Sequence, residues 1–155
     1  MQNYIKSQTR LAFIQYIFQS ELLDFKSFET VKEFQKYFYN SNIAIIGQKK
    51  EFKLKFNKNF LNKLSESYIV NFSNDSIANS IDKYINSERK FNKWNNVLKS
   101  LILALISELQ ITEKNKFKII FNDYINISKS LVTSKETKLL NAIIQKYLDD
   151  KSISK

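Results

Sequence analysis

The sequence predicts an all-α fold, and three observations support that class. First, the 155 residues include one glycine and no proline, whereas sheets, barrels and sandwiches depend on glycine-rich tight turns. Second, long segments combine leucine, isoleucine, lysine, glutamate and asparagine, as helices with polar connections do. Third, apolar residues recur at helical spacing along most of the chain, which predicts about seven helices. No linker or repeat divides the chain, so we expect one domain over residues 1–150.

The segment Asn95–Leu109 is expected to form a central helix around which the other helices pack. Within it, Leu101–Ile106 is an unbroken apolar run. A helix that is apolar on nearly every side has no face for water, so other helices must surround it. Lys99 and Glu108 keep the run well below the roughly 18–20 apolar residues that a membrane span needs. We therefore expect the buried helix of a soluble, cytoplasmic protein.

Four helices are expected before the central one. Apolar residues at helical spacing place them at about residues 1–22, 30–38, 60–72 and 77–85. The second begins at Thr30–x–x–Glu33, which has the form of a capping box. The fourth follows Asn74–Asp75–Ser76, a capping signal. Between the second and third helices, Asn40–Glu51 is expected to be a loop, because it contains the glycine, Gly47.

Two helices are expected after the central one, at about residues 117–131 and 133–148. The last begins with a second capping box, Thr133–x–x–Glu136. Its polar side carries Lys135, Lys138 and Asn141, followed by Gln145. Residues 151–155 are expected to form a frayed tail.

Composition excludes several functional classes. The chain has no cysteine and no histidine, which excludes disulfides, thiol nucleophiles, thiolate or imidazole metal sites and a Ser-His-Asp triad. One glycine is too few for a Walker loop or a dinucleotide fingerprint. The carboxylates form no convincing acid–base pair. We therefore expect no enzymatic activity, no cofactor and no metal.

The net charge of +10 points to an anionic partner such as nucleic acid, an acidic protein or a membrane surface. Alternatively, the lysines only keep the protein soluble. The densest positive charge lies in one segment with Glu51 as its sole acid: Lys49, Lys50, Lys53, Lys55, Lys58 and Lys63. Such a cluster would add salt-dependent attraction that is indifferent to sequence.

The first helix carries a pattern of the form A-R-x-x-A-x-Q-x-L-Y. In Thr9–Leu22, TRLAFIQYIFQSEL, Arg10 and Gln15 match that pattern, and Phe18 stands at its final tyrosine. This pattern opens the NusB family of bacterial transcription antitermination factors, which the chain therefore resembles.

A second set of matches runs from the central helix to the last one. Ser107–Leu109, SEL, is similar to the family's Y-E-L. Phe121–Lys129, FNDYINISK, resembles I-N-E-A-x-E-L-A-K, with Asn122 matching and Asp123 in place of glutamate. Leu139–Asn141, LLN, then resembles the F-V-N of the family's last helix.

The resemblance implies a fold of two small helical bundles and no catalysis. It also implies binding to the boxA element of ribosomal-RNA leader transcripts, together with the small-subunit ribosomal protein that doubles as NusE. The resulting complex keeps RNA polymerase from terminating. The chain departs from the family where several arginines are usual, since only Lys6 and Arg10 lie there. A glycine, a proline and an arginine of the family fall at Ala142, Lys116 and Leu103.

Lys6 and Arg10 are the leading candidates for RNA contact in the first helix. Their i, i+4 spacing places both cations on one face, where they could bind phosphates. Alternatively, both are solvated residues whose aliphatic stems cover the edge of the core. Phe18 could stack on an unpaired base, although its place in an apolar stripe with Ile14 favours packing in the core.

The last helix offers a second group of candidates: Lys135, Lys138 and Asn141. They could contact phosphates or base edges, or they could form only a solvated polar face. Asn122 is expected to have a structural role, with its side chain bonded to backbone near the start of its helix.

Two other functions stay open on the sequence alone. The chain could be a detached relative of the NusB-like RNA-binding module of ribosomal-RNA cytosine methyltransferases, acting in trans with such an enzyme. It could also be a basic helical interaction domain without specific RNA readout, whose weak RNA binding would be lost at moderate salt. We expect no membrane partner. We also expect a monomer or a homodimer, since an exposed partner-binding face could pair with itself.

Overall fold

The computed structural model describes residues 1–23, 31–38, 42–44, 51–53, 55–72, 81–85 and 90–153. Its elements, in chain order, are α1 (Asn3–Leu23), α2 (Val31–Phe38), β1 (Asn42–Ala44), β2 (Glu51–Lys53), α3 (Lys58–Phe72), η2 (Phe91–Lys93), α5 (Asn96–Gln110), η3 (Lys114–Lys116), α6 (Phe117–Ser128) and α7 (Ser134–Ile153). The all-α class is confirmed. Among the described residues, no helix is both long enough and apolar enough to cross a membrane.

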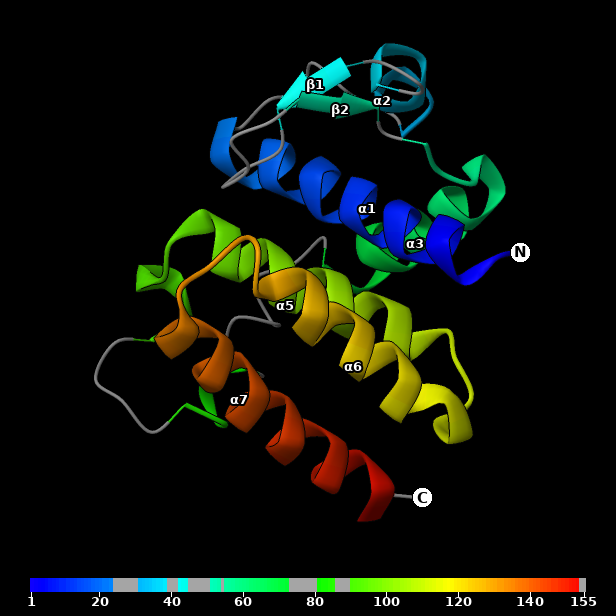
Figure 1. The fold of residues 1–155 in the computed structure, drawn as a ribbon. Helices are drawn as coiled ribbons and strands as arrows, with labels where there is room; N and C mark the ends of the chain where they lie inside the picture. Colours follow the sequence, from blue (N-terminus) through cyan, green and yellow to red (C-terminus); the bar gives the residue numbers. More distant parts are fainter. Residues whose placement is uncertain are drawn as a thin grey trace.

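α5 is the central helix, as the sequence predicts. Every residue from Ser100 to Leu109 is buried. Figure 1 shows α1, α2 and α3 above α5 and α7 below it, and α5 packs against α1, α3, α6 and α7. The Asn95 side chain accepts a hydrogen bond from the Leu98 amide at 2.9 Å and so caps the helix start. The two expected helical groups therefore share one buried helix.

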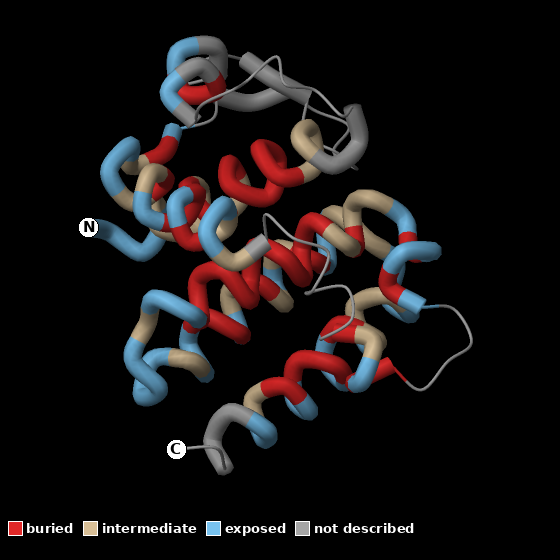
Figure 2. The backbone as a smooth tube through the Cα atoms, turned by 180° about the vertical axis from the view of Figure 1, so that it is seen from behind, coloured by how far each residue is buried: buried red, intermediate tan, exposed pale blue. Residues whose placement is uncertain are grey.

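α1 is more deeply buried than its amphipathic pattern predicts. All residues from Ala12 to Ile17 are buried, because the helix lies between α2 and α3 on one side and α5 and α6 on the other. Two of its aromatic residues make edge-to-face contacts across these interfaces. Phe13 contacts Tyr68 of α3 with ring centroids 6.3 Å apart, and Tyr16 contacts Phe34 of α2 with ring centroids 5.6 Å apart. In Figure 2 the buried positions run through α1 and α5, whereas exposed positions lie at the outer turns.

The predicted loop at Asn40–Glu51 is partly wrong. Asn42–Ala44 and Glu51–Lys53 form a short antiparallel pair, with Ile43 opposite Phe52. Both of these residue types favour strands. The expected capping signals at Thr30 and at Asn74–Ser76 lie outside the described residues, as does the start of the helix expected at 77–85.

The last helix begins where the sequence predicts. The Glu136 amide donates to Thr133 Oγ1 at 3.1 Å, and the Thr133 amide donates to Glu136 Oε1 at 3.1 Å. This reciprocal pair is the predicted capping box. α6 ends at Ser128 rather than near residue 131, and α7 continues to Ile153, so residues 151–153 of the expected tail are helical.

Candidate nucleic-acid interface

Arg10 of α1 is held by two carboxylates from two other helices. Its Nε donates to both carboxylate oxygens of Glu108 in α5, at 3.1 and 2.9 Å, and its Nη2 donates to Glu108 Oε1 at 2.8 Å. Its Nη1 donates to Asp123 Oδ2 in α6 at 2.6 Å. Ser7 Oγ also donates to Asp123, at 2.8 and 2.9 Å. Arg10 is 6% exposed and Glu108 2%. We call this set of four residues the Arg10 network.

Aromatic rings complete the surroundings of the guanidinium. The Arg10 Cζ lies 5.8 Å from the ring centroid of Phe60 and 5.9 Å from that of Tyr124, within the range of a cation–π interaction. Burial alone would lower the pKa of Arg10, but hydrogen bonds and charge from Glu108, with help from Asp123, raise it. Because its pKa is raised, Arg10 stays charged at every pH that the folded protein encounters. Burial, followed by the Glu108 charge, also raises the pKa of Tyr124 well above its ordinary value.

Arg10 does not lie where the sequence prediction needs it. All three of its guanidinium nitrogens donate to carboxylates, so none is presented to a phosphate at the surface. The expected basic pair of Lys6 and Arg10 is corrected to one half-buried lysine and one structural arginine. The sequence did contain a signal for this pairing, since Glu108 closes an apolar run where a carboxylate must find a cation once buried.

Lys6 and the start of α7 lie at opposite ends of α5. Lys6 is one turn before Arg10, and Arg10 contacts Glu108 near the end of α5. At the other end, the Asn95 side chain is hydrogen-bonded to Glu136 in the first turn of α7. Residues 95 and 108 are separated by about 20 Å of helical rise. The candidate RNA residues therefore fall into two groups, not one.

Along the length of the molecule, Phe18 lies nearer to the start of α7 than to Lys6. It lies two turns after Arg10, and α1 and α5 run antiparallel (Figure 1), so it is nearer to the end where α5 and α7 begin. Phe18 is half-buried. Phe18 is therefore partly accessible, although it belongs to a helix that is mainly core.

The polar side of α7 presents exposed residues over three turns. Lys135, Lys138, Asn141 and Gln145 are all exposed, and their spacing keeps them within one face of the helix. We call these four residues the α7 face. The capping box closes the first turn of this helix. The α7 face is not continuous with α1, because α5 and α6 lie between α1 and α7 (Figure 1).

Two further groups from the sequence can be placed. In the basic segment, Lys55, Lys58 and Lys63 are exposed, while the side chains of the lysines at positions 49, 50 and 53 lie outside the described residues. Asn122, expected to have a structural role, is exposed on α6. In the part of the chain that the structure describes, no group of three acidic residues is placed to hold a metal ion.

Comparison with known proteins identifies the family. The model of the NusB family matches residues 7–149. The chain belongs to the NusB family. Curated relatives in Rickettsia conorii and Rickettsia massiliae, both named transcription antitermination protein NusB, are 22% and 21% identical over 141 residues, or 91% of this chain and 89% of each relative. No solved structure matches the chain significantly.

The departures of this NusB chain from the expected pattern fall at places the structure accommodates. Leu103, where the resemblance expects an arginine, is buried in α5. Lys116, where it expects a proline, is the exposed last residue of η3. Ala142, where it expects a glycine, is exposed beside Asn141 on α7. None of these replacements leaves an unpaired buried charge.

Proposed function

We propose that this protein is a transcription antitermination factor that binds boxA-type RNA of ribosomal-RNA leader transcripts, together with a NusE-like small-subunit ribosomal protein. The observation that carries the proposal is the family match over residues 7–149, with relatives named for transcription antitermination. The Arg10 network supports it, because Arg10, Glu108 and Asp123 belong to the short stretches that resemble the family. These residues maintain the NusB fold, and the protein acts by binding rather than by catalysis.

The RNA lies, in this proposal, along the α7 face. Lys135 and Lys138 are exposed cations one turn apart, suited to adjacent phosphates, and Asn141 can both donate to and accept from a base edge. Phe18 lies near the same end of the molecule, but α5 and α6 separate its helix from α7, so it would contact only RNA that extends beyond the α7 face. Lys6, about 20 Å away along α5, adds attraction for the backbone without taking part in base readout.

The test is the affinity for a boxA-like RNA and for a scrambled RNA of equal length, near physiological salt, with and without the ribosomal partner. We expect a preference for boxA that increases when the partner is present. A double variant, Lys135→Glu with Lys138→Glu, should weaken boxA binding more than tenfold, since it replaces two cations with two anions (about 1.4 kcal/mol per factor of ten).

The matched control is Lys55→Glu with Lys63→Glu, which makes the same change of charge at exposed positions in and next to α3. If both double variants weaken binding equally, the interaction is general electrostatic attraction and the α7 face is not the interface. Equal, salt-sensitive binding to both RNAs would leave a basic helical interaction domain. Co-purification with a ribosomal-RNA methyltransferase, without boxA preference, would favour an accessory role in trans.

A further inference from the structure

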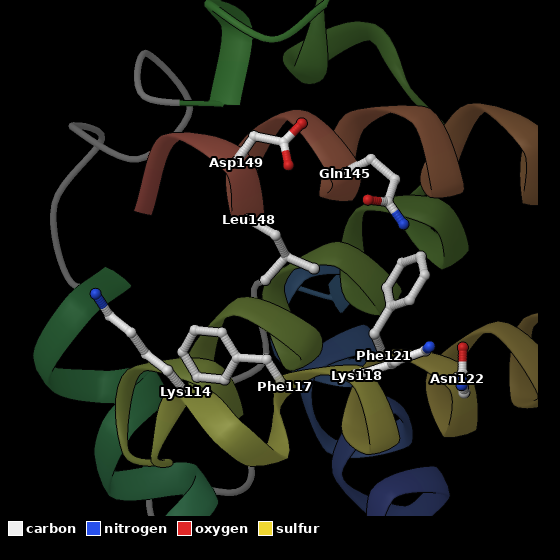
Figure 3. Close-up of a pocket in the computed structure, with 8 residues that line it drawn as sticks. All are labelled: Lys114, Phe117, Lys118, Phe121, Asn122, Gln145, Leu148 and Asp149. Carbon is white, nitrogen blue, oxygen red and sulfur yellow. The ribbon is translucent and has the colours of Figure 1, made fainter. Parts of the chain in front are cut away.

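A groove of about 440 Å³ lies between the start of α6 and the end of α7. Its floor is apolar and consists of Phe117, Phe121 and Leu148 (Figure 3). Phe121 is buried, whereas Phe117 and Leu148 are half-buried. Figure 3 shows the two phenylalanine rings, one helical turn apart, directed into the space between the helices. The volume lies within the range of small-molecule sites.

The rim of the groove is polar and receives side chains from both helices. Lys118 and Asn122 rise from α6, and Gln145 faces them from α7 (Figure 3). All three are exposed. The two carboxamides offer both donors and acceptors, and the lysine offers a positive charge next to an aromatic floor. This combination of ring, amide edge and cation is the one that single-stranded nucleic acid binding uses.

The groove is continuous with the α7 face. Gln145 belongs to both, and it lies two turns after Lys138 on the same side of the helix, about 10 Å along the axis. An RNA strand whose phosphates lie at Lys135 and Lys138 and which continues along α7 therefore reaches the groove within a few nucleotides.

We propose that this groove accepts one unstacked base of the RNA strand that lies along the α7 face. The base stacks on Phe117, the Asn122 and Gln145 carboxamides bind its edge, and Lys118 binds the neighbouring phosphate. The net charge of +10 favours an anionic strand over a neutral peptide, as does the groove lining, which holds two lysines, Lys114 and Lys118, and one carboxylate, Asp149. The inference rests on the proposed RNA-binding function and adds to it a site for a single base.

The experiment combines a variant with a series of RNAs in which one base at a time is removed, leaving the backbone intact. For the unmodified protein, one abasic position should cost affinity because stacking is abolished there. Phe117→Leu should weaken binding to intact RNA about fivefold or more. For this variant, the same abasic position should cost nothing further, because the ring that it stacked on is already absent.

Exposed positions keep the test independent of folding. Lys118→Glu should weaken RNA binding at least about threefold more than Lys116→Glu, its matched control, which makes the same charge change two residues away outside the groove. Gln145→Ala and Asn122→Ala should relax the base preference at that one position.

The outcomes separate the two proposals. If Lys135→Glu with Lys138→Glu weakens binding but Phe117→Leu and every abasic substitution act additively, the groove holds no base and only this inference fails. If the groove variants weaken binding of the ribosomal partner and leave RNA binding unchanged, the groove is a protein contact and the inference is again refuted. If the unmodified protein binds no RNA near physiological salt, the proposed function and this inference both fail.

Discussion

Replacing Arg10 with alanine should destabilise the protein severely while leaving RNA recognition intact. The substitution removes three hydrogen bonds to Glu108 and leaves that carboxylate, which is 2% exposed, without a cation. Asp123 keeps its bonds from Ser7 and is partly open to water, so most of the cost arises at Glu108. Removing one partner of a buried ion pair typically costs about 3–5 kcal/mol.

That loss is a large part of the stability of a domain this size, about 5–15 kcal/mol. Equilibrium urea unfolding, followed by the helical circular-dichroism signal, should report it directly. The melting temperature should fall by about 6–20 °C, since 1 kcal/mol corresponds to about 2–4 °C at this length. The double variant Arg10→Ala with Glu108→Gln should lose less than the single variant, because it no longer buries an uncompensated charge.

Two results would refute this reasoning. A loss below about 1 kcal/mol in Arg10→Ala would mean that the buried pair is not the structural device we describe. RNA affinity should be measured at a temperature where the variant is fully folded, and it should stay within about twofold of the original, because the guanidinium makes no phosphate contact. A tenfold loss of affinity under those conditions would return Arg10 to the RNA interface.

Three further predictions follow from the structure. Burial raises the pKa of Tyr124, so its contribution to the free energy of unfolding should be constant below about pH 10 and should decrease as the pH rises through the folded-state pKa. When urea unfolding is measured across alkaline pH, the free energy of unfolding of Tyr124→Phe should decrease less steeply than that of the unmodified protein. An equally steep decrease would contradict the raised pKa of Tyr124. Thr133→Ala should cost about 1 kcal/mol in the same assay by removing the capping box, whereas Ser134→Ala, the neighbouring control, should cost little. In salt titrations of RNA binding, Lys135→Glu should lower the slope of log K against log salt by about 0.7 for each phosphate that the protein no longer neutralises, and an unchanged slope would show that this lysine touches no phosphate.

Local sequence signals predicted the helices well. The apolar run Leu101–Ile106 identified the buried helix because its burial follows from composition alone. The capping box at Thr133 and Glu136 was also predictable, since the residues that interact are three positions apart. Contacts of this kind depend on neighbouring residues and are therefore written in a short stretch of sequence.

Long-range pairing was not predictable in the same way. Arg10 looked like a surface cation because the sequence places it beside Lys6. The apolar run that Glu108 closes indicates that this carboxylate needs a cation, but no local pattern identifies Arg10 as that cation or places Asp123 next to it. The short strand pair was missed because the pairing of Ile43 with Phe52 depends on a chain reversal that the single glycine only weakly signals. The groove between α6 and α7 likewise requires the packing of two helices to be known.

The Arg10 network has a consequence for the growing chain on the ribosome. Arg10 and Glu108 are 98 residues apart in sequence, so at about 5–20 residues per second the first helix waits about 5–20 s for its partner to be made. During that interval the apolar residues between Ala12 and Ile17, all buried in the finished protein, have no α5 to cover them. α1 is therefore a segment that chaperones can reach early. Synonymous codons that slow translation before residue 108 should lengthen its exposure without changing a single amino acid.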